Sequence, residues 1–181
     1  VEKILIDVKL GENMKINDYK VNGFVKKVNI KAPNDLLIKD ISLNFISDKN
    51  LTLINSLKAN YQGVLVSNGS LSLKRNKHVD IEGKFDSKFI LNKDTLKNLF
   101  SKTDINFLEK NSLNAQGSLL HNFYLKFDEN IKLIDYDYKS SGNISESQII
   151  LKDDFKSNFI ENSIKKILIS QTNLTINLNK K

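Results

Sequence analysis

The most constraining feature of this sequence is an alternation of apolar and polar residues with a period of two. Between Val79 and Leu91 the odd positions are apolar or small, and the even positions are charged except at Ile90. Successive side chains of a β-strand point to opposite faces, so this run predicts a strand with one apolar and one charged face. At about 3.3 Å per residue the strand is roughly 40 Å long, well above the usual five or six residues.

The same alternation recurs along most of the chain. Long runs cover residues 51–65, 113–127 and 134–144, and shorter ones cover 4–10, 41–45 and 174–178. Strands of this length and number predict a mainly β protein.

Local signals indicate how these strands are connected and bent. The apolar phase shifts by one residue near Lys26 and Lys27, which predicts a β-bulge. The dipeptide Asn68-Gly69 stands between two alternating runs, which predicts an antiparallel hairpin there. Glycines within the runs predict bends that curve the sheet strongly. They are Gly63, Gly83, Gly117 and Gly142.

Helical signals are sparse. Residues 92–101 predict one short helix, with Leu96, Leu99 and Phe100 at helical spacing. Residues 154–166 fit either a second helix or an irregular connection. Pro33 is the only proline and no Gly-rich linker divides the chain, so residues 1–181 are expected to form a single unit.

Composition and motifs argue against several functional classes. The net charge of +7 comes mostly from scattered lysines, and Arg75 is the only arginine, a pattern typical of a solvated surface and not of a nucleic-acid site. The chain has no cysteine, and its sequence contains no nucleotide-binding or nucleophile motif. His121 lies on an apolar strand face, so we expect a structural histidine. Asp135 and Asp137 share a polar face without a cleft. We therefore expect no enzyme activity, no catalytic residue, no metal and no cofactor.

The apolar strand faces are then the one candidate functional surface, and two architectures could use them. In a closed β-sandwich or jelly roll they form an ordinary core, and the protein is a structural or scaffold module without a ligand. In a long curved sheet they remain open on the concave side and bind apolar ligands. One or two short helices are too few to cover such strands. The alternation by itself leaves both architectures open.

The order of motifs in the second half resembles the AsmA-like family of bacterial envelope proteins, especially its YhdP-like and TamB-like members. Ile81-Glu82-Gly83-Lys84-Phe85 precedes the Leu-rich helix, and then come residues 113–119, Leu125-Lys126-Phe127 and the tyrosine-rich run 134–144 with its Ser-Gly step. The resemblance covers a little over half of the chain. It implies a long curved antiparallel sheet that forms an apolar groove, of the repeating β-groove or β-taco type.

The resemblance also implies a location and partners. Such proteins are anchored in the bacterial inner membrane, and their periplasmic grooves carry phospholipid or other acyl-chain lipid between the inner and outer membranes and support outer-membrane integrity. The chain begins at Val1 and contains no signal peptide and no membrane-spanning stretch. We therefore expect a periplasmic groove segment of a larger protein, with neighbouring groove segments and a missing membrane anchor in the same parent chain.

The residues expected to contact lipid are the apolar members of the long alternating runs. They are Val79, Ile81, Phe85, Phe89, Leu91, Leu113, Leu119, Phe123, Leu125, Phe127, Tyr136, Tyr138 and Ile144.

Overall fold

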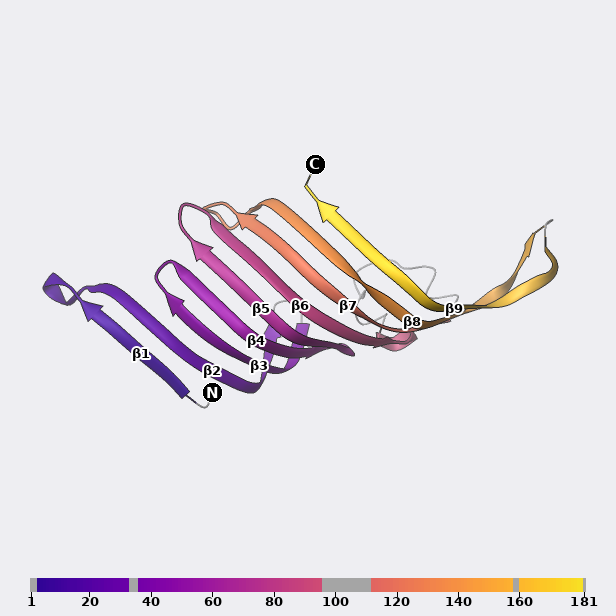
Figure 1. The fold of residues 1–181 in the computed structure, drawn as a ribbon, viewed down its shortest axis with the longest axis horizontal. Coiled ribbons are helices and arrows are strands. Elements are labelled where there is room, and N and C mark those ends of the chain that lie inside the picture. Colours follow the sequence, from indigo (N-terminus) through magenta and orange to yellow (C-terminus); the bar gives the residue numbers. More distant parts are fainter. Residues whose placement is uncertain (1–2, 33–35, 96–111, 158–159, 181) are drawn as a thin grey trace.

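The computed structural model describes residues 3–32, 36–95, 112–157 and 160–180, which form one antiparallel sheet. Its nine strands follow the chain order, so each strand pairs with the one before it and the one after it (Figure 1). The elements are β1 (Lys3–Leu10), η1 (Glu12–Met14), β2 (Ile16–Ala32), β3 (Leu36–Asp48), β4 (Leu51–Tyr61), β5 (Val64–Arg75), β6 (Val79–Leu91), β7 (Ser112–Phe127), β8 (Leu133–Ser157) and β9 (Ile160–Asn179).

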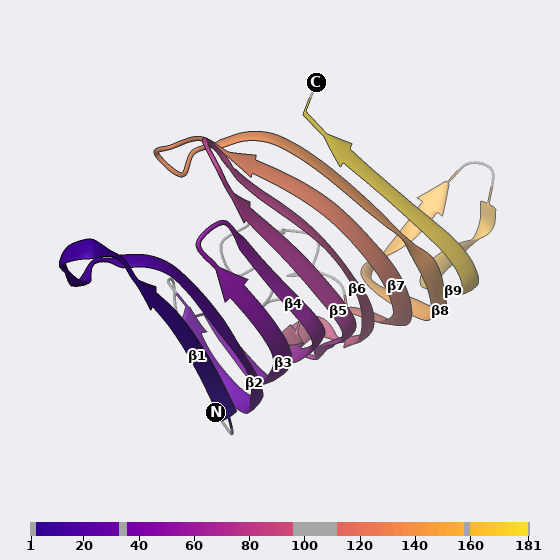
Figure 2. The ribbon, with the colours of Figure 1, turned by 60° about the vertical axis from the view of Figure 1, so that its left-hand side comes forward.

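The sheet is open and curled, with β1 and β9 at its two edges (Figure 2). Among the described elements, extensive contacts join only neighbouring strands, so no second layer made of described residues packs on the sheet. The predicted curved antiparallel sheet is confirmed. The closed sandwich, with two stacked sheets, is wrong for the described part of the chain.

The few buried side chains identify the concave face. Ser87, His121 and Ser140 are buried, and they lie in adjacent strands on the face that carries the odd residues of β6 and β7. Curvature brings the side chains of a single-layer sheet closer together on its concave side, so buried side chains are expected there. The odd residues of β6 and β7 therefore line the concave face.

A row of bulges bends the first half of the sheet. Four residues in neighbouring strands have positive φ, namely Lys27 in β2, Asp40 in β3, Ser56 in β4 and Asn68 in β5. The strand register shifts beside each of them. A bulge bends its strand and increases the local twist, so bulges aligned across four strands curve the sheet along one line. The bulge predicted at Lys26 and Lys27 is confirmed.

The hairpin predicted at Asn68-Gly69 is wrong. Both residues lie within β5, and the turn between β4 and β5 is made by Gln62 (φ 52°) and Gly63 (φ 86°). A tight hairpin of this kind needs positive φ at two successive residues, and Gln62-Gly63 supplies them. Asn68 uses the same left-handed preference for a bulge (φ 51°). Gly63 is thus a turn residue and not a mid-strand bend.

The bulge in β4 also divides one predicted apolar face. Ile54 pairs with Leu71 on the concave face, whereas Leu57 pairs with Gly69 after the register shift. Leu51 and Leu53 alternate with Ile54 and therefore lie on the convex face, opposite to Leu57. The single face predicted over residues 51–65 is wrong in its first part.

The structure differs between the two segments that were predicted to be helical. Residues 93–95 are helical, and the remainder of the predicted helix at 92–101 lies outside the described residues. The segment 154–166 is not helical, because β8 continues to Ser157 and β9 begins at Ile160. Phe155 pairs with Ile164 and Ser157 with Ile160, so the backbone of each strand bonds to the other. Pairing between segments decides this structure, and side-chain spacing within the segment cannot reveal it.

Candidate functional site

The predicted lipid-contact residues lie together on the concave face of β6, β7 and β8. Ile81 lies opposite Leu125, and Leu125 lies opposite Tyr136. Residues that face each other across an antiparallel ladder share a face, so the candidates of the three strands form one surface. Each of them is partly exposed. This surface is called the trough below, and its residues are Val79, Ile81, Phe85, Phe89, Leu91, Leu113, Leu119, Phe123, Leu125, Phe127, Tyr136, Tyr138 and Ile144.

The trough continues across the whole sheet along a row of directly paired residues. The row contains only apolar residues, glycines and one tyrosine, with no charged side chain. It runs from β1 to β9 through Ile4, Gly23, Phe45, Ile54, Leu71, Gly83, Phe123, Tyr138 and Leu178. With about 4.8 Å between neighbouring strands, a row across nine strands is roughly 38 Å long.

Sequence reasoning found only the β6–β8 part of this row. The members in β1 to β5 and in β9 were not among the candidates, although the alternation at Ile4 and at Leu178 was a visible signal. What was missing was the pairing of Phe45 with Ile54 and of Ile54 with Leu71, which bulges in β3, β4 and β5 determine. The row is exposed at both edges of the sheet, with Ile4 46% and Leu178 55% exposed.

Aromatic and aliphatic side chains cover the glycines of the row. A Cβ atom at Gly83 would lie 2.5 Å from Cζ of Phe123 and would also overlap Leu71. At Gly23 it would lie 3.2 Å from the ring of Phe45. The absent side chains allow the neighbouring apolar groups to lie flat on the sheet, so the glycines give the trough a smooth floor.

One polar cluster interrupts the trough. The hydroxyl oxygen of Ser87 lies 2.7 Å from Nε2 of His121, and Nδ1 of His121 lies 2.8 Å from the hydroxyl of Tyr138. The imidazole stacks on Phe85 with 4.4 Å between ring centroids. Burial lowers the pKa of His121 and the nearby charge of Asp86 raises it in part. His121 is thus a buried, hydrogen-bonded residue of the apolar face, as predicted.

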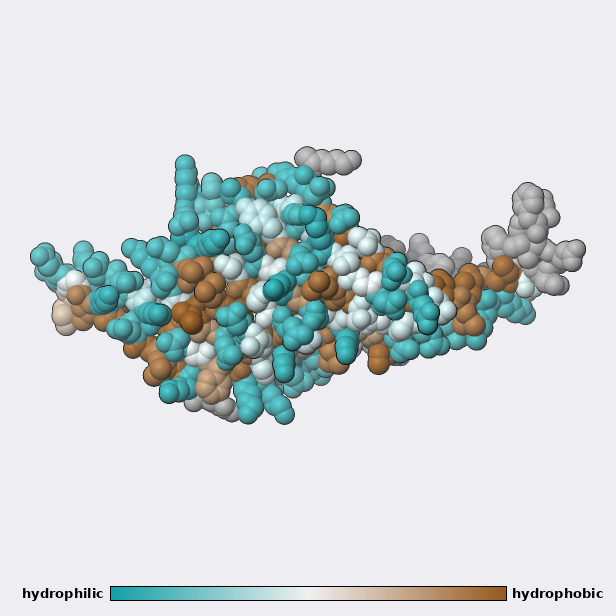
Figure 3. Space-filling view, in the orientation of Figure 1, coloured by the Kyte–Doolittle hydropathy of each residue, from teal (hydrophilic) through white to brown (hydrophobic). Residues whose placement is uncertain are grey.

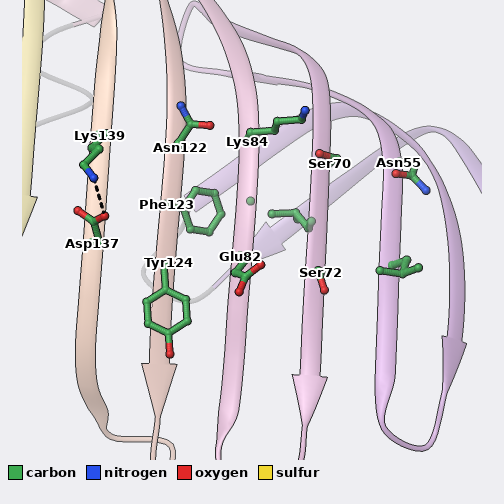
Figure 4. Close-up of a pocket in the computed structure, with 13 residues that line it drawn as sticks. Asn55, Ser70, Ser72, Glu82, Lys84, Asn122, Phe123, Tyr124, Asp137 and Lys139 are labelled. Carbon is green, nitrogen blue, oxygen red and sulfur yellow. Dashed lines mark ion pairs between the residues drawn. The ribbon is translucent and has the colours of Figure 1, made fainter.

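The convex face carries most of the charged residues of the central strands. It faces the reader in Figure 3, where hydrophilic side chains predominate. A shallow hollow on it is lined by polar residues of neighbouring strands, among them Glu82, Lys84 and Asn122, and also by apolar groups of Leu53, Leu71 and Phe123 (Figure 4). Asp137 forms an exposed ion pair with Lys139 at 3.1 Å. These charges are solvated and do not converge on a buried site.

Two other polar groups have structural partners. Arg75 donates hydrogen bonds to the backbone oxygen of Asp48 and to the hydroxyl of Thr52, so it fastens β5 to the β3–β4 turn. On the convex face, Tyr124 donates a hydrogen bond to Asp80 at 2.8 Å, and this bond raises the pKa of Tyr124 to about 12. Both interactions hold neighbouring strands together.

The convex face also has an apolar area over the first strands. Leu5 is 52% and Ile46 43% exposed, and they lie beside Phe24 and Leu53. This area is shorter than the concave row, because its continuation from Leu53 passes to Ser72 and Glu82.

Within the described residues no three acidic or histidine side chains are grouped as metal ligands, and no helix there has the length and apolar character needed to cross a bilayer. No family model matches this chain, and neither a curated protein nor a solved structure matches it. The resemblance to AsmA-like proteins therefore stays a prediction.

Proposed function

We propose that this chain binds phospholipid acyl chains in the trough and conducts them along it. In this proposal the chain is one groove segment of a longer AsmA-like protein that is anchored in the inner membrane. It carries lipid through the periplasm between the inner and outer membranes. The observation that carries the proposal is the uncharged row that crosses all nine strands of the described sheet and remains exposed at both edges.

The dimensions of the row suit an acyl chain. One leaflet of a bilayer has a hydrocarbon thickness of about 15 Å, half of the roughly 30 Å core. The row, at roughly 38 Å, is therefore longer than one extended acyl chain. A lipid chain can lie along the row and move from strand to strand without meeting a charged side chain.

The expected affinity of the trough for an acyl chain also suits movement of lipid along it. Each buried methylene contributes about 0.8 kcal/mol, so a chain of about 16 carbons that buries half its surface gains roughly 6 kcal/mol. Loss of translational and rotational freedom costs an estimated 4–15 kcal/mol. The net affinity for one chain is low, and this allows a chain to leave each position. A phospholipid with both chains in the trough gains roughly twice as much, about 13 kcal/mol, for one loss of translational freedom, so it can be retained during purification. Headgroup selectivity is expected to be weak because the charged groups lie on the other face.

Native mass spectrometry tests this proposal on the purified chain. We expect co-purified phospholipid with the wild type, and a large loss of it with Phe123→Asp, since a carboxylate in the row repels an acyl chain. The matched control is Asn122→Asp, which places the same carboxylate on the exposed convex face of the same strand. Circular dichroism checks that both variants keep the β fold.

The outcomes separate an open trough from a packed core. Phe123 is only partly exposed but has no covering layer in the described structure, so a hydrated carboxylate there should cost little stability. Unfolding of Phe123→Asp alone contradicts an open trough. A wild-type protein that is folded and free of lipid, even after incubation with phospholipid vesicles, refutes the proposal and favours a structural or scaffold module.

A further inference from the structure

The polar cluster stands in the path of any chain that lies in the trough. Tyr138 belongs to the row that crosses the sheet, His121 lies in the next row on this face, and Ser87 lies in the row after that. Ser87 is 3% and His121 8% exposed, whereas Tyr138 is more accessible. A surface that served hydrocarbon alone would have no need of three linked polar groups at this point.

The numbers of hydrogen-bond donors and acceptors decide which atoms of the cluster carry its protons. A neutral imidazole has one N–H donor and one acceptor nitrogen, and a hydroxyl can donate only one hydrogen bond. With the proton on Nε2, His121 donates to Ser87, and the Ser87 hydroxyl proton is left buried without an acceptor among the described residues. With the proton on Nδ1, Ser87 donates to Nε2 and Nδ1 donates to the oxygen of Tyr138.

The second arrangement is favoured because it leaves no donor buried without a partner. A buried donor that lacks an acceptor costs far more than an exposed one. In this arrangement the spare proton is on the hydroxyl of Tyr138, whose bond to His121 is only partly buried. The stacking of Phe85 on His121 holds the imidazole in this orientation.

From this geometry we infer that the Tyr138 hydroxyl donates a hydrogen bond to an ester carbonyl oxygen of a lipid in the trough. His121 and Ser87 act as positioning residues that keep the Tyr138 proton available. The inference rests on the proposed function and narrows its ligand to acyl esters, as opposed to hydrocarbon chains in general. The ester group lies between the chain and the headgroup, so this contact sets the depth at which the headgroup sits.

A comparison of two lipids tests the inference. The probes are dipalmitoyl phosphatidylcholine and its dihexadecyl ether analogue, which share a headgroup and chain length but differ in the two carbonyl groups. Competition binding read by native mass spectrometry gives their affinity ratio. One hydrogen bond predicts about a fivefold preference of the wild type for the ester.

Two variants locate the contact. Tyr138→Phe should abolish the preference by weakening only ester binding, and Tyr136→Phe, on the same face one row away, should retain it. An infrared spectrum of the ¹³C-carbonyl-labelled ester bound to wild type gives a readout that needs no variant, because a hydrogen bond lowers the carbonyl frequency.

The results of these measurements distinguish failure of the ester contact from failure of the proposed function. Ester preference lost in Tyr138→Phe, with a lowered carbonyl frequency in wild type, supports it. Equal binding of both lipids to wild type, an unshifted carbonyl band, or a preference that survives Tyr138→Phe overturns it while the proposed function stands. Binding of neither lipid overturns both.

Discussion

Because Phe123 and Leu71 cover Gly83, the loss of stability in a Gly83→Ala variant can be predicted. In Gly83→Ala the new methyl group meets Cζ of Phe123 at 2.5 Å and also overlaps Leu71, so these side chains must move. Overpacking of this kind costs about 1–3 kcal/mol. Alanine also restricts the unfolded chain, which stabilises the protein by about 0.4–1 kcal/mol. The expected net loss is about 1–2 kcal/mol, because the ring of Phe123 is partly exposed and can shift.

Substitutions at two other glycines provide a comparison for the stability of Gly83→Ala. At Gly11 the nearest atom to an added Cβ is Cβ of Asn17 at 3.5 Å, an ordinary contact, so Gly11→Ala should be neutral or stabilising by up to about 1 kcal/mol. At Gly142 the methyl group meets the backbone of Ser118 and lies 2.8 Å from Cα of Leu119. A strand backbone cannot turn aside as a side chain can, so Gly142→Ala should cost about 3 kcal/mol or more.

Urea unfolding followed by circular dichroism measures the three variants against wild type. A shift of the midpoint at constant slope reports stability alone. In a chain of this size each 1 kcal/mol moves the melting temperature by about 2–4 °C, which gives a thermal check. Equal stability of Gly83→Ala and Gly11→Ala would show that Phe123 and Leu71 do not cover Gly83, and the smooth-floor argument would be refuted.

Two further predictions concern the buried polar groups near the trough. The hydroxyl of Ser140 is buried without a hydrogen-bond partner in the described structure, so Ser140→Ala should be neutral or stabilising by about 1 kcal/mol in urea unfolding, and a clear loss of stability would contradict this. Burial lowers the pKa of His121, so the unfolded state binds its proton more readily. The contribution of His121 to stability is then complete above the unfolded pKa of about 6.5 and is lost as the pH falls toward the lower folded pKa. The unfolding free energy of wild type should fall from pH 7 to pH 5 more steeply than that of His121→Gln, and parallel profiles would disprove this role.

Several features of the fold could be predicted because they depend on neighbours along the chain. The alternation from Val79 to Leu91 follows from the pleat of a single strand, so the faces of β6 were predicted correctly. The bulge at Lys27 was visible because it shifts the phase of the apolar residues within one segment. The burial of His121 followed from its position among Leu119 and Phe123.

Other features depend on partners that lie in other strands. Asn68 and Gln62 both adopt positive φ, but one forms a bulge and the other a turn, and the pairing of β4 with β5 decides which. The segment 154–166 has an ambiguous local pattern, and the backbone bonds between β8 and β9 place its described residues in two antiparallel strands.

For the candidate site, the sequence by itself determined which side chains of each central strand are apolar and that they share a face. This follows because alternate residues of a strand point the same way. Only the tertiary structure decided that these faces join into one row from Ile4 to Leu178, that curvature makes the row concave, and that His121 meets Ser87 and Tyr138. Those relations depend on strand register and on bulges, which arise when separate segments pair and have no counterpart in the alternation itself.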